Sequence, residues 1–322
     1  MYGSTSLMGL TVGVAMGSLA AAQAPPPPIV GGDETGAHDS VGAFVADDGI
    51  SAGAFCSGSL VSATRVVTAA HCVSAMVDFD AAGYAILFVT GEDLSTTAGI
   101  NTSTRVVSAI SHPSYMLTPV LMADIAVAAL ESQPPGLDPI PLNDISPADD
   151  SWPDDRVVHV GFGADDDDGS GTGVKRETTL KLTDYDGHFL YTEDVNGSNL
   201  CMGDSGGAAL VEDGRGDWLL VGVNAFAYDP DGGSPRCEGG AAGSTRIDRN
   251  MDFIDAVLAG EEVDDDGAWA ATSGDPRTGS GSLPDDVKSS CTSVSSSGSL
   301  GAGLLSLGLL AIRRRQGAAG QS

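Results

Sequence analysis

The feature that most restricts how this chain can fold is a long series of short apolar runs separated by turn-forming residues. Between residues 29 and 260, such runs alternate with clusters of Gly, Pro, Asp and Asn. Examples are residues 59–68, 85–89, 125–130, 156–160 and 218–223. Short strands at this spacing are typical of a β-sandwich or β-barrel. The pattern therefore predicts an all-β domain over residues 29–260.

Composition supports a folded protein and excludes one class of partner. Hydrophobic residues make up 42% of the 322 residues, which is enough to bury a sizeable core. Asp and Glu number 44 against 15 Lys and Arg, which gives a net charge of −29. Because binding to phosphate groups needs clustered Lys and Arg, nucleic acid is excluded as a partner and docking on anionic lipid is disfavoured.

One helix is expected near the end of the all-β domain. Met251, Ile254, Val257 and Leu258 fall on one face at helical spacing. Asn250 precedes them, and asparagine side chains commonly cap a first turn. The sequence therefore predicts a short C-terminal helix that begins after Asn250.

The N-terminal residues predict export. Residues 1–24 are uncharged and contain an apolar stretch followed by small residues, as in a secretory signal peptide. The alternative is a buried apolar N-terminal segment. Residues 25–28 are four prolines, a stiff spacer that we interpret as a short prosegment. Secretion would permit disulfides.

The C-terminal residues predict a linker and an anchor. Residues 261–290 are acidic and rich in Gly and Ser, with little to bury, so we expect a linker. Residues 291–322 run from Cys291 through Ser-rich and apolar stretches to three arginines. This arrangement resembles the MYXO-CTERM type of sorting tail, which implies tail-processing machinery and retention at a bacterial cell surface. A plain membrane anchor is the alternative, and either way a membrane would be reached only through this tail.

The cysteines leave the disulfide pattern open. None of the five forms a CxxC pair, so a zinc ribbon has no support. Cys56, Cys72, Cys201 and Cys237 could form two disulfides in any of three pairings, with Cys291 left over in the tail.

Three short motifs carry the chemistry. His71 lies in Thr-Ala-Ala-His-Cys, Asp124 opens an apolar run, and Ser205 lies in Gly-Asp-Ser-Gly-Gly. A nucleophilic serine needs a base to accept its proton and a carboxylate to orient that base. Glycines around the serine leave backbone N–H groups accessible to an oxyanion. The three motifs therefore supply each group that such a site requires.

In this order the motifs resemble those of the chymotrypsin/trypsin-like serine proteases. Residues 29–32, Ile-Val-Gly-Gly, match the N-terminus that members of this family acquire on activation. The resemblance implies two six-stranded antiparallel β-barrels with the active site between them, and a protease domain over residues 29–260. It also implies a serine endopeptidase that acts on proteins or peptides without a cofactor.

The resemblance assigns roles to the motif residues. Ser205 is implied as the nucleophile, His71 as the general base and then acid, and Asp124 as the group that orients the imidazole. The N–H groups of Gly203 and Ser205 are implied to form the oxyanion hole. One implied disulfide, Cys56–Cys72, would brace the histidine loop.

The resemblance also implies an activation step. Asp204 would receive the ammonium group of Ile29 once the prosegment is cut. Because Pro28 precedes Ile29, trypsin-like self-activation is excluded, and a proline-tolerant protease or an aminopeptidase would have to expose Ile29. The second implied disulfide, Cys201–Cys237, would tie the serine loop to a wall of the specificity pocket.

The specificity pocket departs from the trypsin pattern. Asn199 stands at the pocket base, where trypsin-like specificity requires an aspartate, and Ala227 and Ala242 replace the glycines of wide pockets. Ala225 and Phe226 occupy the strand along the cleft, and Ala225 lacks the usual serine hydroxyl. A Lys or Arg side chain would find no ion partner here. We expect a preference for small to medium apolar residues.

Other readings remain open. The acidic clusters at residues 165–168 and 262–267 fit either a solvated charged loop or a calcium site, although neither has the expected later glutamate. The remaining histidines have no metal-ligand spacing, so no metal site is assigned; they are His38, His112, His159 and His188. An alternative function is a catalytically silent homologue that acts as a surface-binding module.

Overall fold

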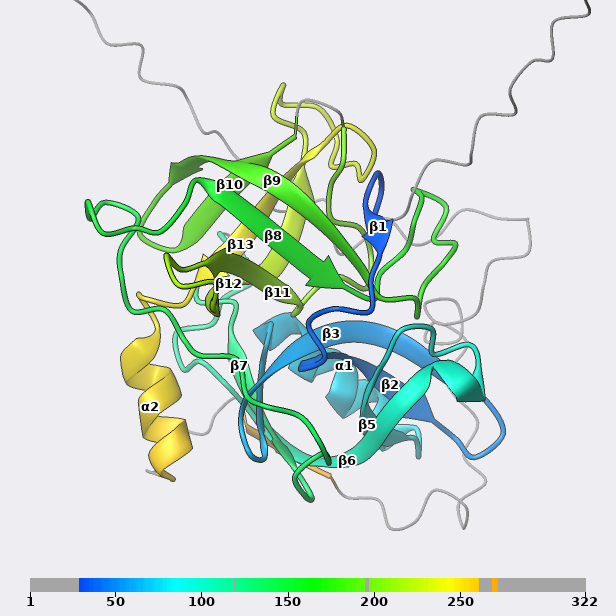
Figure 1. Ribbon diagram of the computed structural model, residues 1–322. Coiled ribbons are helices and arrows are strands. Elements are labelled where there is room, and N and C mark those ends of the chain that lie inside the picture. Colours follow the sequence, from blue (N-terminus) through cyan, green and yellow to red (C-terminus); the bar gives the residue numbers. More distant parts are fainter. Residues whose placement is uncertain (1–28, 119, 195–196, 261–267, 272–322) are drawn as a thin grey trace, which may run out of the picture.

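Two antiparallel sheets, each closed into a barrel, form the body of the computed structural model, which describes residues 29–118, 120–194, 197–260 and 268–271 (Figure 1). The N-terminal barrel has the strand order β6-β5-β2-β3-β4-β7 and is closed by pairing of β6 with β7. Its strands are β2 (Val41–Asp47), β3 (Ala52–Ser62), β4 (Arg65–Thr68), β5 (Ala85–Gly91), β6 (Ile100–Ser111) and β7 (Ala126–Leu130).

The C-terminal barrel has the order β9-β10-β13-β12-β11-β8 and is closed by pairing of β8 with β9. Its strands are β8 (Arg156–Gly161), β9 (Arg176–Tyr185), β10 (Phe189–Glu193), β11 (Ala208–Glu212), β12 (Trp218–Tyr228) and β13 (Ala241–Arg246). A short strand, β1 (Asp33–Glu34), is added to the edge of β9. The prediction of an all-β fold with two six-stranded barrels is confirmed.

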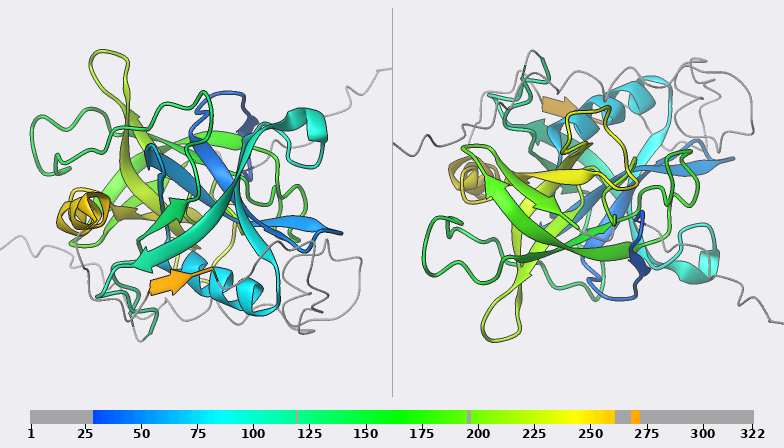
Figure 2. Two further views of the ribbon diagram at one scale, coloured as in Figure 1. Left: turned by 90° about the horizontal axis from the view of Figure 1, so that it is seen from below. Right: turned by 90° about the horizontal axis from the view of Figure 1, so that it is seen from above.

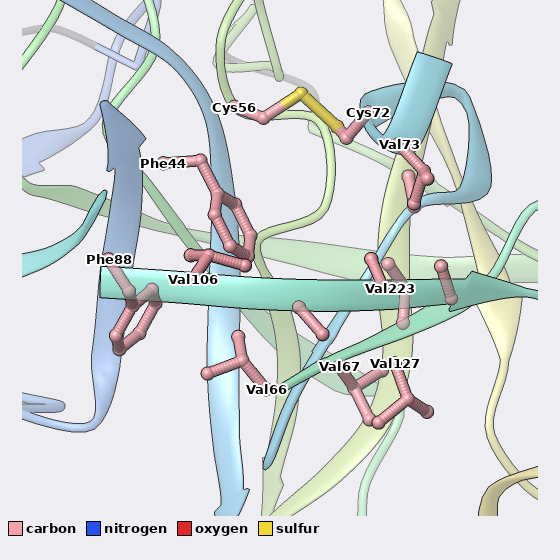
Figure 3. Packing of buried hydrophobic residues seen from close by; sticks show 14 of the residues in the cluster. Phe44, Cys56, Val66, Val67, Cys72, Val73, Phe88, Val106, Val127 and Val223 are labelled. Carbon is pink, nitrogen blue, oxygen red and sulfur yellow. A yellow bond between two sulfur atoms is a disulfide. The ribbon is translucent and has the colours of Figure 1, made fainter. Parts of the chain in front are cut away.

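The core of the N-terminal barrel explains why its strands form where they do. Phe44, Val66, Phe88 and Val106 are fully buried and pack together inside the barrel (Figure 3). The rings of Phe44 and Phe88 have centroids 5.6 Å apart. Gly58 on β3 lies against this cluster, where a Cβ would come within 2.8 Å of the Phe44 ring. A larger residue at position 58 would therefore displace the core.

One apolar run of the sequence proved to be a hairpin rather than one strand. Residues 59–68 divide into the end of β3 and the whole of β4, which pair with each other. The turn between them reverses the chain, so that β4 runs antiparallel to β3. The chain then enters α1 (Ala70–Ala81), a helix that the sequence analysis did not predict. A one-turn 3₁₀ helix, η1 (Thr97–Gly99), precedes β6.

The predicted C-terminal helix is present as α2 (Met251–Ala259), but its cap differs from the expectation. It buries Phe253, Ile254 and Val257 against the core. The side chain of Asn250 does not cap the first turn; instead its Nδ2 donates a hydrogen bond to the carbonyl of Arg246. Asn250 therefore ties the helix back to β13 rather than satisfying the helix N-terminus.

The expected linker contains a strand. Residues 268–270 form β14 (Ala268–Ala270), which pairs with β6 beside α1 (Figure 2). Trp269 is 7% exposed, packs in the main core and donates its Nε1–H to Asp80 Oδ2 at 3.3 Å. The expectation that residues 261–290 have little to bury is therefore wrong at this point. A single tryptophan in an otherwise polar stretch was the signal for it.

No helix among the described residues combines the length and apolar character needed to cross a membrane. The predicted signal peptide, prosegment and sorting tail lie outside the described residues and stay predictions.

Candidate active site

The structure joins His71 to Asp124, although 53 residues separate them in sequence. His71 lies in the first turn of α1, and Asp124 lies just before β7 with no exposed surface. The backbone N–H of His71 donates to Asp124 Oδ1 at 3.0 Å, and His71 Nδ1 lies 2.7 Å from Oδ2. Both carboxylate oxygens therefore hold the same histidine. With the proton on Nδ1, the lone pair of Nε2 is left to accept another proton.

The surroundings of His71 raise the pKa of its imidazole. Burial alone lowers the pKa of His71, but the charge of Asp124 and the hydrogen bond to it outweigh burial and raise the pKa overall. The fully buried carboxylate is therefore placed to stabilise an imidazolium ion.

The loop that carries Ser205, residues 201–207 (the serine loop), lies between the two barrels and is held by Ser57 of β3. The backbone N–H of Ser57 donates to the carbonyl of Ser205 at 2.8 Å, and its hydroxyl donates to the carbonyl of Gly203 at 2.9 Å. The same hydroxyl accepts the N–H of Phe162 at 3.0 Å. Sequence analysis did not identify Ser57 as a site residue, and its position next to Cys56 was the only signal.

Gly206 fits the loop tightly against the N-terminal barrel. Its φ is +83°, a conformation that favours glycine. A Cβ on Gly206 would lie 2.1 Å from Thr68 Oγ1 and 2.3 Å from the carbonyl oxygen of Ser57. The residue that follows Ser205 can therefore only be glycine in this arrangement.

Two disulfides flank these groups. Cys56 is bonded to Cys72, the residue after His71, and Cys201 is bonded to Cys237. This is the pairing that the family resemblance implied, out of the three that the sequence left open. Cys72 Sγ lies 3.6 Å from the carbonyl oxygen of Ser205, so the first disulfide places the serine loop beside the histidine helix.

Asp204, the residue before Ser205 in the serine loop, has no exposed surface. Its two carboxylate oxygens accept the N–H groups of Gly163 at 2.8 Å and Cys201 at 2.9 Å. Burial raises its pKa to about 6, although those hydrogen bonds and the charge of Arg176 act in the opposite direction. Ile29, its implied partner, also has no exposed surface. The carboxylate is thus a costly buried charge that an added cation would stabilise.

The raised pKa of Asp204 predicts how stability depends on pH. Its folded pKa lies above the usual value of 3.8, so the folded chain holds this proton more tightly than the unfolded chain. The contribution of Asp204 is therefore favourable below pH 4 and is lost as pH rises to about 6, by up to about 3 kcal/mol. Urea unfolding of the uncut chain between pH 4 and 7 measures it. Asp204→Asn should remove that pH-dependent part, and identical pH profiles for the two proteins would contradict the prediction.

The predicted pocket residues lie on the paired strands β12 and β13, except Asn199, which lies in the segment between β10 and β11. Asn199 is fully buried; its N–H donates to the carbonyl of Val30 at 2.8 Å. Ala242 on β13 pairs with Ala227 on β12 and is also fully buried. The preceding residue of β12, Phe226, is half-buried. The predicted pocket base is therefore bonded directly to the predicted activation segment.

The remaining cleft residue, Ala225, is 4% exposed. Two carboxylates of the acidic loop at residues 165–168 accept backbone N–H groups. Asp166 Oδ1 accepts those of Asp168 and Ser170 within the loop, and Asp167 Oδ1 accepts the N–H of Cys237, 70 residues away. Calcium binding stays a prediction, and the second acidic cluster at residues 262–267 lies outside the described residues.

Comparison with known families shows which family has this fold and these motifs. The sequence model of the trypsin family, described as Trypsin, matches residues 29–254. The chain belongs to the trypsin family. The match ends within α2, so β14 lies beyond the part of this chain that the trypsin-family model covers.

Individual relatives support the same conclusion. The chain is 28% identical over 214 residues to a trypsin of Saccharopolyspora erythraea, covering 62% of this chain and 86% of that trypsin. It is 26% identical over 204 residues to the CLIP domain-containing serine protease B15 of Anopheles gambiae, covering 53% of each. An ovochymase of Halocynthia roretzi is 30% identical over 223 residues, which are 63% of this chain and 13% of the ovochymase. The chain thus spans about half of the clip-domain protease and a small part of the ovochymase.

Proposed function

We propose that this trypsin-family protein is a serine endopeptidase that hydrolyses peptide bonds through an acyl-enzyme on Ser205. The observation that carries the proposal is the pair of hydrogen bonds by which both oxygens of buried Asp124 hold His71. A purely structural histidine would not need a fully buried carboxylate on its ring and its backbone at once. The substrates of the proposed endopeptidase are proteins or peptides.

The proposed chemistry gives each of these groups one role. His71 Nε2 accepts the hydroxyl proton as Ser205 Oγ attacks the peptide carbonyl, and Asp124 stabilises the imidazolium that results. The N–H groups of Gly203 and Ser205 receive the negative charge on the substrate oxygen. The imidazolium then gives its proton to the leaving amine. Water repeats the sequence on the acyl-enzyme, with His71 again as base.

Labelling with a fluorophosphonate probe tests the proposal. The probe forms a covalent bond to an activated serine, so we expect labelling of the processed protein and none of Ser205→Ala. A matched control is Ser114→Ala, an exposed serine outside the proposed site, which should label fully. Correctly folded, processed protein that does not label would instead support a silent homologue that acts as a surface-binding module.

We further propose that the pocket selects small to medium apolar residues rather than Lys or Arg. The base carries Asn199 instead of a carboxylate, and Ala227 and Ala242 narrow the walls. A desolvated cation at the base would lack an ion partner. Alanyl and valyl chromogenic peptides should therefore turn over faster than arginyl ones. Faster turnover of the arginyl peptide would overturn this specificity.

Activation is proposed to require release of Ile29. Its new ammonium group would pair with Asp204, the buried carboxylate whose pKa is raised in the uncut chain. Because Pro28 precedes Ile29, the activating protease must accept proline. Protein made to begin at Ile29 should be active, whereas protein that retains residues 25–28 should have low activity. Equal activity of the two would overturn the proposal.

Export and retention are proposed from the ends of the sequence. A signal peptide at residues 1–24 would direct secretion, and a tail at residues 291–322 would be processed for retention at a bacterial cell surface. N-terminal and C-terminal sequencing of the mature protein tests both. A mature protein that begins at Met1 would exclude the signal peptide.

A further inference from the structure

A buried polar network in the C-terminal barrel has no part in the chemistry described above. His159 on β8 has no exposed surface; its Nδ1 lies 2.9 Å from Asn224 Oδ1 and its Nε2 lies 3.0 Å from Thr192 Oγ1. Ser244 Oγ donates to the same Asn224 oxygen at 3.4 Å. The four side chains come from β8, β10, β12 and β13, so the network joins four of the six strands of this barrel (the strands are labelled in Figure 1).

The direction of each hydrogen bond follows from the charge of His159. Burial lowers its pKa to about 4, opposed in part by the hydrogen bond to Asn224, so the ring is neutral at ordinary pH. A neutral imidazole has one donor and one acceptor. Because Asn224 Nδ2 donates to the carbonyl of Val160 at 3.3 Å, Oδ1 faces the ring. His159 Nδ1–H therefore donates to Asn224, and Nε2 accepts the Thr192 hydroxyl.

The backbone of Asn224 holds the loop of the proposed nucleophile. The N–H of Gly206 donates to the Asn224 carbonyl at 2.7 Å, and the N–H of Asn224 donates to the carbonyl of Gly207 at 2.9 Å. These two glycines directly follow Ser205. One residue thus has its side chain locked by His159 and its backbone bonded to the serine loop.

The serine loop has little room to adapt if β12 moves. On the other side of the loop, Gly206 is packed so closely against Thr68 and Ser57 that a Cβ on Gly206 would clash with both. The loop is therefore held between Asn224 and the N-terminal barrel, which also carries His71 on α1. A shift of Asn224 would change the position of Ser205 relative to His71.

We propose that His159 is a positioning residue, which orients Asn224 and through its backbone fixes Gly206, Gly207 and the Ser205 nucleophile. An apolar side chain at position 159 could fill the same space but could not hold the Asn224 amide. The role in catalysis rests on the proposed peptidase function. The role in fixing the loop can be measured without it.

Kinetics of His159→Leu and His159→Gln test the catalytic part. Leu removes both hydrogen bonds, whereas the Gln amide can still donate to Asn224 and accept from Thr192. Since a misplacement of about 1 Å costs roughly 10²-fold in rate, we expect His159→Leu to lower kcat per titrated active site at least tenfold, with KM within about twofold. His159→Gln should remain within about threefold of wild type. Wild-type kcat in His159→Leu, or equal loss in both variants, would overturn the proposal.

Two further variants separate positioning from loss of stability. Thr192→Val keeps the shape of the side chain and removes only the hydroxyl that donates to His159. It replaces His159→Leu as the test if that variant does not fold, and it should lower kcat by a smaller factor. Leu190→Val is the matched control. Leu190 is 1% exposed and lies on β10, as Thr192 does, but its side chain packs in an apolar cluster that contains none of the side chains of the His159 network. It should lower stability and leave kcat per active site unchanged. A kcat loss in Leu190→Val that matches its loss of stability would contradict a specific role for His159.

Hydrogen exchange gives the readout that needs no activity. The amide of Gly206 is protected by its bond to Asn224, so exchange of a peptide spanning residues 203–209 should be faster in His159→Leu and unchanged in Leu190→Val. Unchanged exchange in His159→Leu would sink the proposal. If wild-type protein fails to label with fluorophosphonate, the proposed function fails, while the exchange result still decides whether His159 positions the loop.

Discussion

Asp124→Asn should lower kcat about 10⁴-fold while leaving the fold intact. The asparagine can still accept the backbone N–H of His71, which now bonds Oδ1 of Asp124. Its amide group would, however, face His71 Nδ1 as a donor. The imidazole would then carry its proton on Nε2, and that nitrogen could not accept the proton of Ser205. Turnover of a chromogenic peptide and the thermal midpoint of both proteins measure the two halves of this prediction.

The matched control is Asp255→Asn, which makes the same change on the exposed face of α2. It should retain wild-type kcat. A loss below tenfold in Asp124→Asn would mean that Asp124 does not orient the base. A large fall in its thermal midpoint would mean that the carboxylate serves mainly to stabilise the fold through its bonds to His71.

Trp269→Ala should destabilise the protein by about 3 kcal/mol or more, because a buried indole leaves a large cavity when it is removed. Trp269 is 7% exposed and lies in the main core, as the middle residue of the strand β14 that pairs with β6. Trp269→Phe should recover most of this loss, since it keeps the packing and gives up only the bond from Nε1 to Asp80. Urea unfolding of the full chain gives the free energies.

The control for Trp269→Ala is Ala270→Ser, at an exposed position of the same strand. It should change the free energy of unfolding by less than about 0.5 kcal/mol. If Trp269→Ala is equally mild, residues 268–271 are not part of the folded domain. The result therefore also decides whether the domain ends after α2 or extends to residue 271.

Much of the fold followed from the sequence because strands and their separating turns are local signals. The limits were equally physical. The helix α1 was missed because its first turn, around His71, continues a β-branched run and has no side-chain cap. Asn250 was assigned as a cap from its residue type, but a carbonyl of β13 competes for the same amide.

The candidate site depended on motifs rather than on periodicity. His71, Asp124 and Ser205 stood out because they lie in three short motifs that follow one another along the chain in the order of a known family. The structure places His71 Nδ1 next to Asp124 Oδ2. His159 carried no such signal. Its partners lie 33 and 65 residues away, so only the closing of the barrel brings them together.

The position of the two disulfides has a consequence for where this protein can work. Cys72 is the neighbour of His71, and Cys201 lies within the loop that leads to Ser205. A thiol reductant that opened these bonds would release the proposed base and the proposed nucleophile together. In a reducing cytosol the chain would therefore stay silent, whatever its N-terminus, and it would become competent only after reaching an oxidising compartment. The cell that makes it would be shielded from its proposed activity by redox chemistry as well as by the proposed prosegment.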